Sequence, residues 1–128
     1  SVMSTIKVDT LVAADGSSAV TLTKQSAAKS WFQVDGTGTA TIDGSFNTSG
    51  LVDEGTGQYT ISFTNSMSDT HYAFTQGLEY TYSGSLVLAT YTEASKVTGS
   101  CRAIHNAASG GASVDVPETS GNIDGDLA

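Results

Sequence analysis

The stretch that decides the fold is YTISFT, residues 59–64, in which apolar side chains alternate strictly with hydroxylated ones. Successive side chains of a β-strand point to opposite faces, so this alternation predicts a strand with one buried and one solvated face. Strands of that kind belong to antiparallel sheets that are packed on one side only. The turn sequence DEGTG, residues 53–57, comes directly before it and marks the end of a preceding strand.

Similar short runs lie on both sides of this stretch and are separated by turn residues. We expect strands at 31–34, 39–42, 51–52, 71–74, 79–82, 86–91, 96–104, 113–116 and 122–127. Turn signals recur roughly every 8–12 residues and no helical period of apolar residues persists, which predicts an antiparallel sandwich or barrel. Asp43–Gly44 is expected to stop the 39–42 strand. The part after Gly110 has few core residues and is predicted as an edge strand with a loosely held end.

The composition fits a turn-rich β protein of a single domain. Of the 128 residues, 14% are charged, against about a quarter in ordinary soluble domains. The net charge of −8 disfavours binding to the phosphates of nucleic acids or to anionic membrane surfaces. No apolar run approaches the roughly 20 residues of a membrane span. We therefore expect neither nucleic acid nor membrane as a partner.

Residues 1–29 differ from the rest of the chain because they contain no aromatic residue. Two short alternating runs, 6–12 and 20–23, flank an Asp15–Gly16 turn signal. Such a segment has little material for a core of its own, so it must lean on another part of the protein, a second copy or a larger assembly. We predict two units: an attachment and oligomerisation segment at 1–29 and a β-sandwich module at 30–128.

Side chains able to carry out catalysis are sparse, and the candidates are His71, His105 and Cys101. On a strand, Cys101 and His105 would share a face but lie ~13 Å apart, and no catalytic signature surrounds them. We expect no catalytic residue and no cofactor. Cys101 is predicted to be a buried thiol, His71 a strand residue beside a turn, and His105 a loop or strand-end residue. A single cysteine also excludes an internal disulfide.

Two acidic clusters, Asp53–Glu54 and Asp124–Asp126, have the oxygen atoms that calcium prefers. Neither belongs to a helix–loop–helix pattern. Acids in β-turns commonly accept hydrogen bonds from nearby backbone amides, and we expect these to do the same. No metal site is predicted.

Aromatic side chains near amides and acids raise a second possibility, a carbohydrate site. The candidate binding residues are Trp31, Tyr80 and Tyr82, because a flat aromatic face suits a sugar ring. Tyr80 and Tyr82 share one face of a predicted strand, and Tyr72 precedes them closely. Core packing or a subunit contact is the better single explanation of these residues, since a tyrosine buries a large area while its hydroxyl reaches water.

The chain resembles a module of marine bacteriophage tail-fibre-like proteins in three blocks: SWFQVDGTGT at 30–39, SFN at 45–47 and DEGTGQYTISFT at 53–64. In that module a Trp strand leads to an Asn/Asp-Gly-Thr-Gly-Thr turn, and an Asp-x-Gly-Thr-Gly-x-Tyr-Thr hairpin leads to a Phe-Thr strand. MSDTHYA at 67–73 and MSTIKVDTL at 3–11 are similar to further blocks, although Ser68 stands where the family often has Pro. The resemblance extends from Met3 to Phe74 and more loosely to the end of the chain.

The resemblance implies a virion protein, assembled as a trimer, in which the β module forms a knob and the start of the chain attaches it to other capsid or tail proteins. The expected fold is an antiparallel β-sandwich of jelly-roll or lectin-like type. The expected function is that of a non-enzymatic bacteriophage structural protein, a fibre-like surface appendage for attachment or adhesion, with host-surface glycans as a possible partner. A capsid decoration protein that stabilises the phage head and a lectin-like carbohydrate-binding module are the alternatives.

Overall fold

The computed structural model describes residues 7, 9–17, 28–79, 87–90, 95–107 and 110–128. Within these residues the chain forms nine β-strands and no α-helix. They are β1 (Ser30–Asp35), β2 (Thr41–Phe46), β3 (Thr48–Gly55), β4 (Gln58–Phe63), β5 (Ala73–Glu79), β6 (Val87–Thr90), β7 (Lys96–Val97), β8 (Ser100–Ala107) and β9 (Glu118–Asp124). No helix long and apolar enough to cross a membrane is found in this part of the chain.

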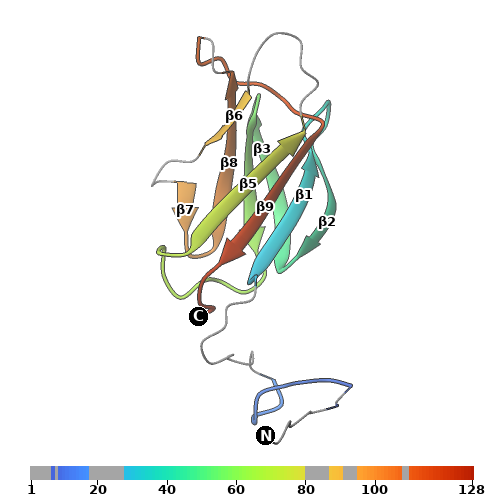
Figure 1. Cartoon of the computed structure of the whole chain (residues 1–128), viewed down its shortest axis with the longest axis vertical. Helices are drawn as coiled ribbons and strands as arrows, with labels where there is room; N and C mark the ends of the chain where they lie inside the picture. Colours follow the sequence, from blue (N-terminus) through green and yellow to red (C-terminus); the bar gives the residue numbers. More distant parts are fainter. Residues whose placement is uncertain (1–6, 8, 18–27, 80–86, 91–94, 108–109) are drawn as a thin grey trace, which may run out of the picture.

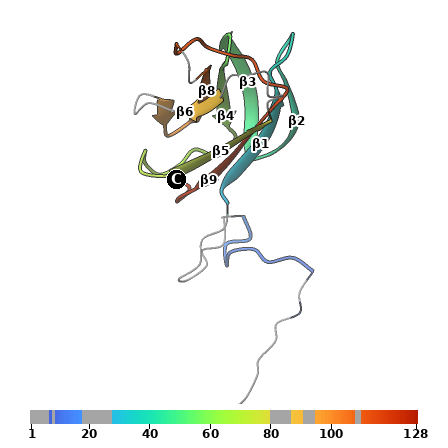
Figure 2. The same cartoon turned by 45° about the horizontal axis from the view of Figure 1, so that its top comes forward.

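The strands form two sheets that pack face to face (Figure 1 and Figure 2). Sheet A has the order β2-β1-β9-β5, and sheet B has the order β3-β4-β8-β6, with β7 also pairing with β8. All of these pairings are antiparallel. The prediction of an all-β antiparallel sandwich is confirmed.

The YTISFT stretch lies in and just after β4, in the middle of sheet B, as its alternation predicts. Tyr59, Ile61 and Phe63 are buried between the sheets, and the hydroxylated residues between them are partly exposed. Opposite them, sheet A contributes Phe32 and Phe74, whose ring centroids lie 6.1 Å apart. Burial of these large side chains, each worth roughly 1.5–3 kcal/mol, holds the two sheets together.

The chain passes from sheet A to sheet B at Asn47, which has a positive φ of 55°. Asparagine tolerates this left-handed conformation better than most residues because its short side chain bonds locally. Here the Asn47 amide donates to the carbonyl oxygens of Lys29 and Asn65 at 2.9 and 3.1 Å, and it accepts from the Asn65 N–H at 2.7 Å. The corner is thereby tied to the start of β1 and to the end of β4.

The prediction of an edge strand and a loose end after Gly110 is wrong. β9 lies inside sheet A, between β1 and β5, and Thr119 and Ile123 are fully buried. Its inward face includes Gly121, because the ring of Phe32 fills the space that a side chain there would occupy. Few large apolar residues are needed on such a strand. The chain end is also held: Leu127 forms a β-bridge with Met67, and two further backbone hydrogen bonds join residues 126 and 128 to residues 68 and 66.

Two other predicted boundaries differ from the structure. Asp43–Gly44 does not stop a strand, because β2 runs through it to Phe46 with a register shift opposite Gln33/Val34. The predicted strand at 113–116 is reduced to an isolated bridge between Ser113 and Asn106. The predicted strands at 79–82 and 86–91 lie partly outside the described residues.

Residues 7 and 9–17 contain the predicted Asp15–Gly16 turn. Gly16 has a φ of 77°, its N–H donates to the carbonyl of Ala13 at 2.9 Å, and Asp15 accepts from the Ser17 N–H. No strand occurs in these residues, and most of the two runs predicted as strands lies outside the described part. The division at residue 29 stays a prediction.

Candidate functional site

The outer face of sheet A carries a small array of polar side chains around one exposed indole. Directly paired residues of antiparallel strands point to the same face, and alternate residues along each strand share it. One row across the sheet is Trp31, Asn122 and Thr75, from β1, β9 and β5. The next row on that face is Gln33, Ser120 and Gly77.

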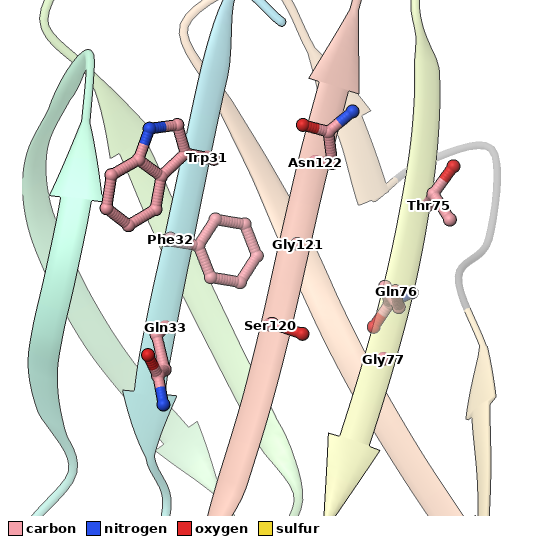
Figure 3. A pocket seen from close by; sticks show the side chains of 9 residues that line it. All are labelled: Trp31, Phe32, Gln33, Thr75, Gln76, Gly77, Ser120, Gly121 and Asn122. Atoms are coloured by element: carbon pink, nitrogen blue, oxygen red, sulfur yellow. The ribbon is translucent and has the colours of Figure 1, made fainter.

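This array encloses a shallow hollow of about 370 Å³ (Figure 3). Its lining consists of Trp31, Phe32, Gln33, Thr75, Gln76, Gly77, Ser120, Gly121 and Asn122. Two small residues of the second row, Gly77 and Ser120, keep the floor of the hollow low: Gly77 has no side chain, and a Cβ added to it would lie 3.0 Å from the Ser120 hydroxyl oxygen. The longer side chains of the lining surround this floor.

Trp31 borders the hollow and is 43% exposed. Its indole lies over Gly44 of β2, where an added Cβ would be 3.4 Å from Cζ3 and 3.5 Å from Cη2. Figure 3 shows the ring face-on, between β1 and β2. Phe46, the direct partner of Trp31 in β2, is 56% exposed, so these two rings give this end of sheet A an apolar surface. The missing side chain at Gly44 allows the indole to lie flat against the sheet.

None of the nine lining residues carries a charge. The charged residues at other outward positions of β1, β5 and β9 are all acids: Asp35, Glu79, Glu118 and Asp124. The Asn122 amide donates to a carboxylate oxygen of Asp124 at 2.7 Å. Figure 3 shows the Asn122 carbonyl oxygen turned toward the Trp31 side. The hollow is thus an uncharged patch with hydrogen-bonding groups, and the charged residues on the strands around it are acids.

A second, smaller hollow of about 210 Å³ lies on the outer side of sheet B. Arg102 is its charged group, and this side chain is already engaged: it forms an ion pair with Glu54 at 3.0 Å and donates to the Thr60 hydroxyl at 3.0 Å. The Asp53 carboxylate next to Glu54 accepts the N–H of Gly55, as predicted for a turn acid. No group of acids, histidines and cysteines suited to a metal occurs among the described residues.

The three residues considered for catalysis are not assembled into a site. Cys101 is fully buried, as predicted, and burial raises the pKa of its thiol to about 12, so it remains protonated. His71 is an exposed residue beside Asp69, just before β5. His105 was expected in a loop or at a strand end, and that expectation is wrong. It lies within β8, and its inward position follows from the alternation that also buries Cys101.

His105 is sealed between the sheets. Its Nε2 lies 2.9 Å from the Thr119 hydroxyl, and its ring packs against Tyr59 at a centroid distance of 5.9 Å. The Nδ1 atom is buried and has no hydrogen-bond partner among the described residues. Burial lowers the pKa of this imidazole, partly opposed by the charge of Asp115.

Asp115 fastens the loop between β8 and β9 to the β3–β4 turn. One of its oxygens lies 2.8 Å from the Tyr59 hydroxyl and accepts the Gly57 N–H at 2.7 Å. The Tyr59 hydroxyl also lies 3.2 Å from the carbonyl of Gly36. Burial, followed by the hydrogen bond to Asp115, raises the pKa of Tyr59 above its usual value. These polar groups satisfy one another and serve the fold.

Of the predicted carbohydrate-binding residues, the structure places Trp31 on an open face. Tyr80 and Tyr82 lie outside the described residues. Tyr72, considered with them, is buried, and its hydroxyl lies within hydrogen-bond distance of the carbonyls of Val97 and Ser100, at 3.1 and 3.0 Å. The sequence did not single out the polar partners of Trp31, namely Gln33, Thr75, Ser120 and Asn122. The alternation of these residues within their strands can be read from the sequence, but the pairing of strands that are distant in the sequence cannot.

No family model matches this chain, and neither a curated protein nor a solved structure is similar enough to count as a match.

Proposed function

We propose that this chain is a non-enzymatic structural protein of a bacteriophage virion, the knob of a fibre-like surface appendage for attachment or adhesion. One observation carries the proposal: the sandwich keeps its thiol and one of its imidazoles in the core and presents, on an open face, an uncharged hollow beside an exposed indole. A molecule with these features is suited to presenting a surface to a partner. The blocks that resemble phage tail-fibre-like proteins supply the virion setting.

The described part of residues 1–29 supports an attachment role for the start of the chain. Leu11 and Val12 are 63% and 54% exposed, so neither side chain is covered by an apolar partner within the part of the chain that the structure describes. A partner that covers two adjacent exposed aliphatic residues removes apolar surface from water, which lowers the free energy of the complex. In the proposal that partner is a second copy of the chain, within a trimer of jelly-roll or lectin-like sandwiches, or a neighbouring capsid or tail protein.

The test compares particles carrying the full chain with particles offered a chain that lacks residues 1–27. The truncation stops short of Lys29 because the N–H of that residue donates to Ile123 and its carbonyl accepts from Asn47. We expect the full chain to co-purify with particles and the truncated chain to remain free. A Leu11→Ser/Val12→Ser variant of the full chain should show the same loss, whereas Val52→Ser, at an exposed position of sheet B, should not.

Undiminished association of both altered chains would contradict the assignment of residues 1–29. A capsid decoration role gives a different outcome: particles without the protein lose their nucleic acid at lower temperature but still adsorb to the host. Particles that adsorb poorly but tolerate heat as well as intact ones support the appendage role.

A further inference from the structure

We propose that the hollow on the outer face of sheet A binds a neutral saccharide, with one pyranose ring stacked on Trp31. This inference deepens the proposed function and rests on it for its biological setting, because an adhesive knob needs a surface that recognises a ligand. The binding itself is a property of the folded module and is tested without particles.

The indole supplies the stacking surface. The face of an aromatic ring carries negative electrostatic potential, and the C–H bonds on a sugar face are weakly positive. Trp31 is exposed on a strand, and its ring rests against the backbone at Gly44, so its orientation is largely set before a ligand arrives. A preorganised side chain loses little conformational freedom on binding.

The polar groups around the hollow match the hydroxyls of a sugar. Gln33 and Asn122 carry amides, which donate and accept, and Thr75 and Ser120 carry hydroxyls, which do both. Adjacent sugar hydroxyls are themselves donors and acceptors. The low floor at Gly77 and Ser120 leaves room for a ring between these side chains.

Charge points to a neutral saccharide and not to an acidic one. None of the lining residues is charged, and the nearby outward positions carry Asp35, Glu79, Glu118 and Asp124. The whole chain has a net charge of −8. A uronate, a sialic acid or a sulfated sugar would meet a repulsive field and no cation in the lining.

The same features argue against a protein occupant. A stable protein interface buries about 800 Å² on each partner around an apolar centre. Among the described residues, the exposed large apolar side chains of this face are Trp31 and Phe46. Two copies meeting here would bring their acids together, which costs free energy. The hollow of about 370 Å³ falls instead within the size range of small-ligand pockets, roughly 300–1,000 Å³.

Trp31 is the single tryptophan of the chain, so its fluorescence reports on this site alone. The full-length protein is titrated with methyl glycosides of glucose, galactose and mannose, with oligomers of these sugars, and with methyl glucuronide and methyl sialoside. We expect a saturable change in the emission of Trp31 with at least one neutral saccharide, at a dissociation constant of roughly 1 mM, the affinity of a small open site. The two acidic sugars should bind at least about tenfold more weakly.

Gly77→Thr is the variant that locates the site, because it fills the hollow and keeps the fluorescent probe. It should weaken saccharide binding by about tenfold or more with the emission of the free protein little changed. Trp31→Ala, followed by saturation-transfer NMR of the sugar, should abolish binding. Val52→Ala, at an exposed residue of sheet B, should leave the dissociation constant unchanged. Thermal unfolding of each variant tests whether the variant is folded.

Four outcomes overturn the inference: no saturable change with any neutral saccharide, unchanged binding by Gly77→Thr, preference for an acidic sugar, or a lower molar mass of Trp31→Ala in light scattering. The last would make this face a subunit contact. Failure here leaves the proposed function standing if the full chain still associates with particles. Loss of that association with intact sugar binding would overturn the virion role alone.

Discussion

Phe32 and Gly121 face each other across the β1–β9 pair, and each restricts the residue at the other position. The Phe32 ring occupies the place of a side chain at 121. We expect Gly121→Ala to lower the free energy of unfolding by about 1–3 kcal/mol, because extra atoms in a packed core force their neighbours to shift. Gly50→Ala is the matched control: it adds the same methyl group to a strand glycine with open space around it. Urea denaturation measures both, and equal effects of the two substitutions would contradict the packing argument.

His105 should make stability depend on pH. Its pKa in the folded protein lies below the ordinary value of 6.5, because burial penalises the charged imidazole. The unfolded chain therefore takes up a proton first as the pH falls through 6.5, and the free energy of unfolding decreases until the folded pKa is reached. Above pH 6.5 the imidazole is neutral in both the folded and the unfolded state, so it does not make the free energy of unfolding depend on pH. The groups facing it are Thr119, Tyr59 and the charge of Asp115.

The free energy of unfolding, measured by urea denaturation between about pH 8 and pH 5, tests this titration. His105→Gln should flatten the loss below pH 6.5, whatever its effect on stability at neutral pH. His71→Gln makes the same substitution at an exposed position and is the matched control. A His105→Gln profile parallel to that of the unchanged protein would show that another group titrates.

At the scale of elements, the contrast between β4 and β9 shows how far the sequence predicts the fold. β4 places large apolar residues at alternate positions, so both its type and its buried face can be predicted. β9 buries Thr119, Gly121 and Ile123, a set that includes one large apolar residue. This strand can be central because Phe32 and Phe74 fill the space above its small residues. That packing follows from the strand order, which the sequence of β9 alone does not contain.

The candidate site shows the same limit. Trp31 is identifiable from sequence because it alternates with Phe32 in a short strand. Its row partners Asn122 and Thr75 come from β9 and β5, and their nearness follows from the antiparallel registers β1–β9 and β5–β9. Register across distant strands is set by packing of the whole core, so a single sequence does not reveal it.

Asp115 joins elements that the sequence separates, and it provides a prediction at this scale. Replacing it with Ala leaves the Gly57 N–H and the Tyr59 hydroxyl without their carboxylate acceptor. An unsatisfied buried polar group costs about 1–3 kcal/mol, and the Tyr59 hydroxyl keeps the Gly36 carbonyl as a neighbour, so Asp115→Ala should destabilise the protein by about that amount. Tyr59→Phe removes one of the two donors and should cost less. The free energies of unfolding of the two variants test this order.

Asp53→Ala is the control for the Asp115 prediction, since Asp53 accepts a single backbone N–H in an exposed turn. Amide hydrogen exchange adds a local readout. In Asp115→Ala the Gly57 N–H should exchange much faster, while the amides of β1 should not. Protection of the Gly57 amide in that variant would mean that the loop between β8 and β9 is held by other contacts.

For the molecule as a whole, the described contacts close the sandwich without help from residues 7 and 9–17. The core consists of residues from β1 onward, and among the described residues the hydrogen bonds of the sandwich that reach furthest toward the start of the chain involve Lys29. In the proposed function, sheet A offers its outer face for recognition, and the preceding segment binds elsewhere through its exposed Leu11 and Val12. The proposal thus assigns recognition and attachment to separate parts of one chain.

This separation predicts that removing residues 1–27 changes association but not folding. The truncated chain should unfold in one cooperative transition, with a free energy within about 1 kcal/mol of the full chain and the same dependence on urea concentration. Since that dependence scales with the surface exposed on unfolding, an unchanged value means that the lost segment buries little surface in the monomer. A markedly smaller value, or loss of cooperativity, would show that residues 1–27 are part of the folded core. Light scattering completes the test: if residues 1–27 oligomerise the chain, the full chain has a multiple of the protomer mass and the truncated chain does not.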